Sequence, residues 1–243
     1  MKCEVFSTEA ALAAALGRRI IEMIGRQPDV VLGLPTGRTP LALYQELIRL
    51  THEERVDWSV VRTFNLDEFV GLGRGDRGGY RTFMENRLFE HVNLVERNIE
   101  FLDGRAADLD RECERYERAV VASGGVDLML LGIGVNGHIG FNEPAGSLVA
   151  RTHRVTLDEP TRAANMMWFD GDLERVPREA LTMGMGTILQ SRSIVLIATG
   201  DAKSEAVTAL LRGGVTTRFP ASFLQLHPRV RVLLDVLLAD QVP

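Results

Sequence analysis

The sequence predicts an α/β protein: a doubly wound, mostly parallel, Rossmann-like sheet with helices on both faces. Three observations predict this fold class. Short, continuous apolar runs alternate with amphipathic stretches along the chain, as strands buried on both faces alternate with helices. Glycine or proline follows several of these runs, for example Pro35 and Gly37 after VVLGL. The 243 residues, 45% of them hydrophobic, are enough to build a large core.

The elements follow in order along the chain. Residues 1–25 predict an amphipathic first helix capped by Ser7 or Thr8. Apolar runs predict strands at 30–34, 60–66, 98–102, 126–134, 193–199 and 230–238, and alternation predicts an edge strand at 151–157. Helical spacing predicts helices at 41–50, 80–92, 108–123 and 201–211. We expect the segment Pro160–Thr182 to be helical and mobile, a candidate lid. No repeat or linker divides the chain, which predicts one domain over residues 1–243.

The composition excludes several classes of protein. A net charge of -5 argues against a nucleic-acid-binding surface, which needs a basic stripe. No apolar run approaches the roughly 20 residues that cross a bilayer, so we expect no membrane association. The two cysteines, Cys3 and Cys113, are far apart and fit a reducing, cytoplasmic setting without disulfides. No interface pattern is evident, which leaves a homo-oligomer open.

Ligands of doubly wound sheets bind beyond the carboxyl ends of the strands, so the residues there are the candidates. The first is PTGRTP (35–40), where Thr39 is a plausible helix N-cap and Pro40 a first helical residue. Such a junction points backbone N–H groups at an anion. The alternative is an ordinary turn, and the motif lacks the lysine and spacing of a nucleotide P-loop.

Two carboxylates follow the strand expected at 60–66. Because Asp67 and Glu68 are adjacent in an extended segment, they should point to opposite sides and have different roles. If Asp67 faces the cleft, it could abstract a proton from a carbon acid. The alternative is a solvated acidic turn.

The glycine-rich stretch GIGVNG (132–137) matches G-x-G-x-x-G, and Asp158 lies 21 residues beyond it, as in a dinucleotide-binding fingerprint. That fingerprint requires a helix to begin inside the motif. The residues that follow, HIGFNEPAG (138–146), form a poor helix because they contain glycines and a proline. A nicotinamide or flavin cofactor is therefore disfavoured.

Polar residues in the same stretch favour proton transfer. His138 can shuttle a proton near neutral pH, and Glu143 can orient it or supply a second proton. The alternative is a loop histidine that only satisfies its own hydrogen bonds. His138 has no histidine or cysteine partner at metal-ligand spacing, so no metal is expected.

A lysine marks a fourth strand end. Of the 28 basic residues, only Lys2 and Lys203 are lysines. A cation in the first turn of the helix expected at 201–211 opposes the helix dipole. This indicates a role as a compact point charge, such as phosphate binding, unless chance placed it there.

Together these pieces resemble the glucosamine-6-phosphate deaminase (glucosamine-6-phosphate isomerase) family. The matching segments are LGLPTGRTPL, TFNLDEFVGL, LLGIGVNGHIGFNEP, ARTHRVTL, EALTMGMGTIL, GDAKSEAV and SFLQLHP, in order from residue 32 to 228. The combination of NGHIGFNEP with an upstream NLDE is specific to this family.

The resemblance implies conversion of an aminosugar 6-phosphate to fructose 6-phosphate and ammonia, without cofactor or metal. It implies that His138 assists ring opening, with Asn136 and Glu143 beside it, and that Glu143 orients and charge-balances the imidazole. Asp67 takes the C2 proton and returns it at C1. The implied substrate- and phosphate-binding residues are Thr36, Gly37, Arg38, Thr39, Gly137 and Lys203.

The chain departs from the family pattern at several positions. Asn136 stands where some members have aspartate, and Met167 stands where the pattern places an arginine that reaches the substrate. Arg162 should not fill the same space. His153 and Val155 stand where allosterically activated members have basic residues, so we expect no activation by N-acetylglucosamine 6-phosphate there.

These departures keep three alternatives open. One is a deaminase for a different aminosugar phosphate. The others are a 6-phosphogluconolactonase-like hydrolase and a non-catalytic sugar-phosphate sensor. Ammonia release, lactone hydrolysis and binding without turnover distinguish them.

Overall fold

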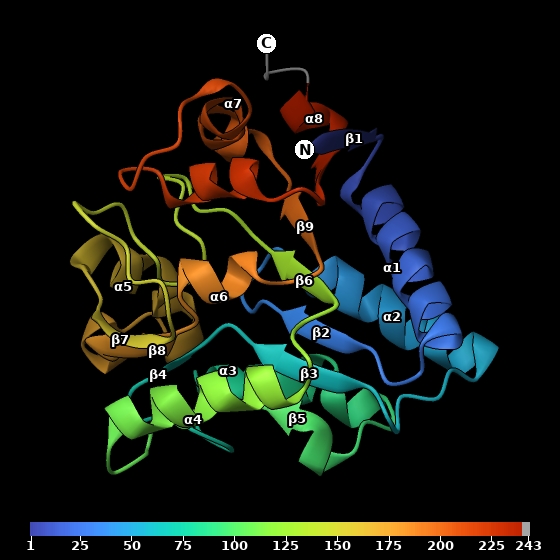
Figure 1. Cartoon of the computed structure of the whole chain (residues 1–243), viewed down its shortest axis with the longest axis horizontal. Coiled ribbons are helices and arrows are strands. Elements are labelled where there is room, and N and C mark those ends of the chain that lie inside the picture. The colour runs from blue at the N-terminus through green and yellow to red at the C-terminus, as the bar shows by residue number, and fades with distance from the viewer. Residues whose placement is uncertain (240–243) are drawn as a thin grey trace.

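A computed structural model describes residues 1–239 as two sheets surrounded by helices (Figure 1). The last four residues of the domain predicted at 1–243 lie outside the described residues. The main sheet has seven strands in the order β1-β10-β9-β6-β2-β3-β5, and every neighbouring pair is parallel. The predicted fold class, a mostly parallel sheet covered by helices on both faces, is confirmed.

The strands of this sheet are short. They are β1 (Lys2–Phe6), β2 (Val31–Leu34), β3 (Arg62–Asn65), β5 (Ile99–Glu100), β6 (Leu128–Leu131), β9 (Ser193–Ala198) and β10 (Val230–Asp235). The helices are α1 (Glu9–Arg26), α2 (Leu41–Glu54), α3 (Tyr80–Arg87), α4 (Leu109–Ala122), α5 (Glu159–Asn165), α6 (Met185–Leu189), α7 (Ser204–Arg212) and α8 (Val236–Ala239). Short 3-10 turns join them, among them η1 (Phe89–His91), η2 (Glu96–Asn98), η3 (Met166–Phe169), η4 (Leu173–Arg175), η5 (Asp201–Lys203) and η6 (Pro220–Leu226).

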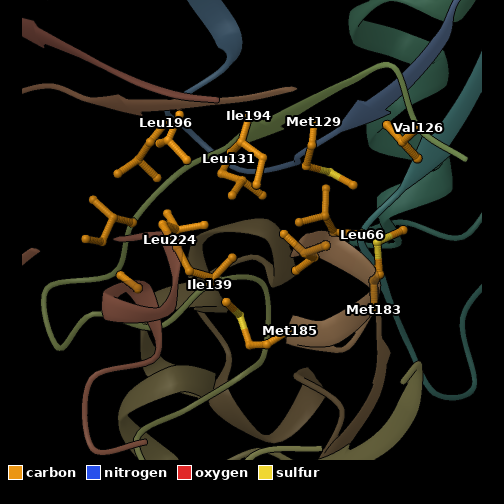
Figure 2. Close-up of a cluster of buried hydrophobic side chains, with 14 of the residues drawn as sticks. Leu66, Val126, Met129, Leu131, Ile139, Met183, Met185, Ile194, Leu196 and Leu224 are labelled. Carbon is orange, nitrogen blue, oxygen red and sulfur yellow. The ribbon is translucent and has the colours of Figure 1, made fainter. Parts of the chain in front are cut away.

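Both faces of the central strands β2, β6 and β9 are buried, which explains their continuous apolar runs. In β9, Val195 and Ile197 belong to the core under α1 and α2. Ile194 and Leu196 belong to the opposite core, which α4, α6 and α7 cover (Figures 1 and 2). Alternate side chains of one strand therefore supply two cores, so a strand in this position needs apolar residues throughout.

A second, three-stranded antiparallel sheet packs beside the first. It consists of β4 (Asp67–Phe69), β8 (Glu179–Thr182) and β7 (His153–Thr156) in the order β4-β8-β7. Leu66 and Met183 flank this sheet and pack into the core beneath the main sheet, near Met129 of β6 (Figure 2). The sequence predicted β7 as an edge strand, but it did not reveal β4, which has only three residues. The helical prediction for Pro160–Thr182 is wrong at its end, because Glu179–Thr182 forms β8.

Several boundaries differ from the predictions. Thr8 does cap α1, because its hydroxyl accepts a hydrogen bond from the Ala11 amide at 3.1 Å. The strand β1 before it was missed. The strand predicted at 230–238 ends at Asp235, and a short helix follows. The N-cap expected at Thr39 is wrong: Pro40 occupies that position, and no side chain caps α2.

The strand order creates a switch point between β2 and β6. From β2 the chain moves outward to β3 and β5, and it then returns to build β6 on the other side of β2. The carboxyl ends of β9, β6, β2 and β3 consequently lie next to one another, where open α/β sheets bind ligands. Within residues 1–239, none of the helices combines the length and the apolar character that crossing a membrane requires.

Candidate active site

Asp67 begins β4, directly after β3 ends, and its side chain is buried, with only 6% of its surface exposed. The loop that carries His138 approaches it closely. A Cβ atom placed on Gly140 would lie 3.3 Å from Asp67 Oδ2 and 3.0 Å from Thr182 Oγ1. Two segments that are far apart in sequence therefore meet at this carboxylate.

Burial makes the Asp67 carboxyl group unusually basic. Loss of solvent and the neighbouring negative charge of Glu68 raise its pKa to about 8, although a hydrogen bond from Thr36 opposes the rise. A carboxylate with a pKa near that of the medium is well matched to accept a proton from carbon and to return it.

Glu68 faces the other way and has a structural role. Its carboxylate accepts hydrogen bonds from the backbone amides of Phe69 at 2.8 Å, Tyr80 at 2.9 Å and Arg81 at 2.8 Å. Burial raises its pKa to about 7 even though these three amides oppose the rise. Since the N-cap residue of α3 is Gly79, which has no side chain, Glu68 supplies the missing cap. The two adjacent carboxylates thus serve different partners, as their alternation in a strand predicts.

His138 and Glu143 form a pair in the loop after β6. The imidazole Nδ1 lies 3.3 Å from Glu143 Oε1, without the alignment of a full hydrogen bond. Asn136 Nδ2 donates to Glu143 Oε2 at 2.8 Å, and the Asn136 Oδ1 accepts from the backbone amide of His138 at 3.2 Å. Asn136 therefore orients the carboxylate and the loop, and it does not contact the imidazole.

The charge of Glu143 is well stabilised. Burial alone would raise the pKa of its carboxyl group, but His138, Thr161 and Asn136 together lower it to about 2. An ionised carboxylate beside Nδ1 favours the tautomer that carries the proton on that nitrogen. The lone pair then lies on Nε2, where it can accept a proton from a ligand.

The glycines of the stretch 132–137 permit close packing. A Cβ on Gly134 would overlap the His138 ring, and a Cβ on Gly137 would overlap the ring of Phe219. Gly137 also has φ +82, a conformation that L side chains rarely adopt. The Ala221 amide of η6 donates a hydrogen bond to the Gly137 carbonyl at 2.9 Å, which holds the loop that carries His138 against η6.

The dinucleotide-binding alternative does not fit this geometry. Residues 132–152 contain no helix, so the element that would present its N-terminus to a pyrophosphate is missing. Asp158, at the spacing of the acidic fingerprint residue, instead caps α5 by accepting from the Thr161 amide at 2.9 Å.

The predicted anion loop, residues 36–39, joins β2 to α2. Gly37 has φ +84 and makes the turn, and Arg38 is exposed. Thr39 reaches the end of β6, since a Cβ on Gly132 would lie 3.5 Å from its hydroxyl oxygen. The loop is therefore adjacent to the segment that leads to His138.

Lys203 lies beyond the carboxyl end of β9, the strand next to β6. It ends the 3-10 turn η5 and occupies the N-cap position of α7, just before the helical turn in which the sequence placed it. Its side chain is half-buried, and burial lowers the pKa of its ammonium group. Within residues 1–239, no carboxylate forms an ion pair with Lys203 (the pairs formed involve arginines and His138).

Met167 belongs to η3, 54% of its surface is exposed, and it lines a cavity of about 250 Å³ with Arg77, Trp168 and α3. Arg162 does not replace the expected arginine. Its guanidinium donates to the carbonyls of Leu173 at 2.6 Å and Val176 at 3.0 Å.

A larger cavity of about 610 Å³ is lined by α4 and by residues 151–154 at the start of β7. His153 lines it with Arg151 and Arg154, whereas neither Asp67 nor His138 does. This cavity is therefore apart from the candidate active site.

Two residues that support the site were not identified from the sequence. Thr161 Oγ1 donates to Glu143 Oε1 at 2.8 Å, and Phe219 packs against Gly137. The N-cap at Asp158 was a signal for a helix starting before Thr161. Neither contact partner could be read from sequence spacing.

The family model described as glucosamine-6-phosphate isomerases/6-phosphogluconolactonase matches residues 7–233. The chain belongs to this family. The predicted resemblance is confirmed at the level of the family over nearly the whole chain.

Relatives in the glucosamine-6-phosphate isomerase/6-phosphogluconolactonase family are similar along most of their length. Glucosamine-6-phosphate deaminase 1 of Giardia intestinalis is 49% identical over 224 residues, which cover 92% of this chain and 84% of that protein. Glucosamine-6-phosphate deaminase 1 of Bacillus subtilis is 45% identical over 235 residues, covering 97% and 96%.

Solved structures of the family agree. The structure of a monomeric glucosamine-6-phosphate deaminase superposes with a TM-score of 0.95 at 44% identity, covering 99% of this chain and 100% of that one. A 6-phosphogluconolactonase from Thermotoga maritima superposes with a TM-score of 0.76 at 18% identity, covering 96% and 98%, which shows a shared fold.

Proposed function

We propose that the protein is a glucosamine-6-phosphate deaminase, which converts glucosamine 6-phosphate and water to fructose 6-phosphate and ammonia. The observation that carries the proposal is the meeting of a basic, buried Asp67 with the loop that holds the His138–Glu143 pair. The deaminase relatives at 49% and 45% identity support it.

The first step is opening of the sugar ring. His138 Nε2 accepts the proton of the anomeric hydroxyl and delivers a proton to the ring oxygen, which breaks the bond between C1 and that oxygen. The positive charge that forms on the imidazole is balanced by the Glu143 carboxylate 3.3 Å from Nδ1. A fixed counter-charge in a partly buried site stabilises the charged intermediate state.

The second step moves a proton between two carbons. Deprotonated Asp67 removes the C2 proton from the open aldehyde and gives an enolamine. Asp67 then returns the proton to C1, and the resulting imine at C2 is hydrolysed by water to the ketone and ammonia. A single carboxyl group serves both transfers because C1 and C2 are adjacent.

The phosphate group binds at the loop formed by Thr36, Gly37, Arg38 and Thr39, with Lys203 opposite. Gly137 contributes its backbone to the substrate site. Lys203 is suited to this role, because an ammonium group without an anionic partner among the described residues is available to a phosphate. The chemistry needs proton transfers, water and an anion site, and we assign no metal or organic cofactor to it.

We further propose that residues 1–243 act as one domain in the cytoplasm, with a small aminosugar phosphate as the small-molecule partner and a homo-oligomer left open. Cys3 is exposed and Cys113 is buried, and both are free thiols, which fits a reducing compartment.

An assay of ammonium release over a panel of sugar phosphates tests the function. We expect release from glucosamine 6-phosphate and no hydrolysis of 6-phosphogluconolactone. Hydrolysis of the lactone without ammonium release would favour the hydrolase alternative. Binding of glucosamine 6-phosphate without turnover would favour a sensor.

Met167 favours a second candidate, a deaminase for a different aminosugar phosphate. A methionine can neither donate a hydrogen bond nor carry charge, and this one, in η3, is 54% exposed. If the second candidate is correct, Met167→Arg should raise kcat/KM for glucosamine 6-phosphate. The measurement is kcat/KM on the same panel, with Met166→Arg as the neighbouring control. An unchanged or lower value in Met167→Arg would remove the reason for a different substrate.

A further inference from the structure

We propose that Thr161 is a positioning residue that holds the Glu143 carboxylate against the His138 imidazole. Through this contact, α5 sets the geometry of the pair that opens the sugar ring. The inference rests on the proposed function, since it assigns a supporting residue to the same reaction.

The contact engages the oxygen that faces the imidazole. Thr161 Oγ1 donates to Glu143 Oε1 at 2.8 Å, and the same Oε1 lies 3.3 Å from His138 Nδ1. The other oxygen, Oε2, accepts from Asn136 Nδ2 at 2.8 Å. One donor on each oxygen prevents the carboxylate from rotating. Hydrogen bonds to an ionised carboxylate are stronger than those between neutral groups, so this restraint is substantial.

Thr161 is itself held in place. It is 8% exposed and lies in the first turn of α5, where its amide donates to the Asp158 carboxylate at 2.9 Å. Asn165 Nδ2 donates to the Thr161 carbonyl at 2.9 Å. A threonine in a helix is restricted to two main rotamers, so the fixed backbone limits the directions of the hydroxyl, and the bond to Glu143 selects one of them.

The helix is anchored on both sides of the site. Arg162 ties it to the carbonyls of Leu173 and Val176. The Tyr80 hydroxyl donates to Asn165 Oδ1 at 3.0 Å, and the Tyr80 ring packs on Phe69 of β4, 4.8 Å between centroids. The strand that begins with Asp67 therefore supports the same helix that holds Glu143.

Thr161→Val tests the role, because it removes the hydroxyl and keeps the β-branched shape. Without the donor, Oε1 loses its restraint and the imidazole loses a fixed partner. We expect kcat for glucosamine 6-phosphate to fall by about 10- to 100-fold, the loss of one hydrogen bond to a charged group. KM should change little, since Thr161 is not part of the phosphate-binding loop.

Two control variants separate positioning from stability. Thr161→Ser keeps the hydroxyl and should restore most of kcat. Thr152→Val is the matched control, because Thr152 is also buried and donates its hydroxyl to a carboxylate, Glu117 Oε1, at 2.6 Å. This residue lies away from His138, so its variant should lose stability without a comparable loss of kcat. Thermal denaturation of all three variants measures the stability change.

A partial reaction distinguishes positioning of Glu143 from a purely structural role, because a general loss of structure would slow deamination and the partial reaction alike. With ammonium present, fructose 6-phosphate forms the C2 imine and releases water, and Asp67 then exchanges a C1 proton of this imine with solvent deuterium. Ketose rings open without help more readily than aldose pyranoses do. Thr161→Val should therefore slow deamination much more than deuterium exchange. If Thr161→Val slowed deamination and deuterium exchange equally, or if its kcat equalled that of the wild type, the role of Thr161 would be refuted and the proposed function would stand. A wild-type protein that releases no ammonia would instead overturn the proposed function, and the inference with it.

Discussion

Replacing Asp67 by asparagine should abolish deamination and at the same time stabilise the protein at neutral and alkaline pH. The amide keeps the shape of the side chain but cannot accept the C2 proton. We expect kcat to fall by about 10²- to 10⁴-fold, the usual contribution of a general base. Binding of glucosamine 6-phosphate, measured by calorimetry, should remain close to that of the wild type.

The stability gain follows from the raised pKa of Asp67. In the unfolded chain this group ionises in the usual range of aspartate, whereas in the folded protein its pKa is about 8. Ionising it in the folded state therefore costs stability, and this cost grows as the pH rises toward 8 and is constant above that value. The asparagine variant avoids the cost, so its free energy of unfolding should exceed that of the wild type by several kcal/mol at pH 8.

Denaturant unfolding at several pH values measures this effect. The two proteins should have similar stability near pH 3, and the difference should widen as the pH rises. Glu68→Gln provides the contrast, because an amide side chain cannot accept all three backbone N–H groups of Phe69, Tyr80 and Arg81. It should destabilise the protein. An Asp67→Asn variant that is less stable than the wild type at pH 8 would contradict the raised pKa of the Asp67 carboxyl group.

Replacing His138 by glutamine should produce the second large effect, and this effect should depend on the substrate. Glutamine can hydrogen-bond to a sugar but cannot transfer a proton, so ring opening falls to its spontaneous rate. Deamination of glucosamine 6-phosphate should slow by about 10²-fold or more. Deuterium exchange at C1 of fructose 6-phosphate, measured with ammonium present to form the C2 imine, should slow far less, because it depends on Asp67.

His52 offers a matched control for this variant. It is an exposed histidine on α2 whose Nε2 contacts the carbonyl of His91. His52→Gln should leave both reactions unchanged. Equal losses of deamination and exchange in His138→Gln would refute a specific role in ring opening.

Much of the site could be predicted from the sequence because strand ends are local features. The positions of Asp67, His138 and Lys203 after apolar runs were enough to place them at one edge of a parallel sheet. The order of the strands in the sheet could not be read from short stretches of sequence. This order places β6 beside β2, and the loop 36–39 and the loop with His138 are therefore neighbours.

Other features arose only from packing between distant segments. The strand β4 has three residues, too few for a periodic signal, and its partner β8 lies more than a hundred residues later. The hydroxyl that holds Glu143 comes from α5, and the ring that covers Gly137 comes from Phe219. No spacing rule connects such pairs, because each contact depends on how the elements between them fold.

The sequence by itself determined the fold class, a cap at Ser7 or Thr8 for the first helix, and the residue types available for acid–base chemistry. These properties depend on hydrophobic period, local capping and side-chain chemistry, all of which are written in short stretches of the chain. The tertiary structure decided which groups meet and how acidic they are. Burial by residues remote in sequence makes Asp67 a base, whereas nearby donors keep Glu143 ionised, and only the folded chain fixes solvent access and charge separation.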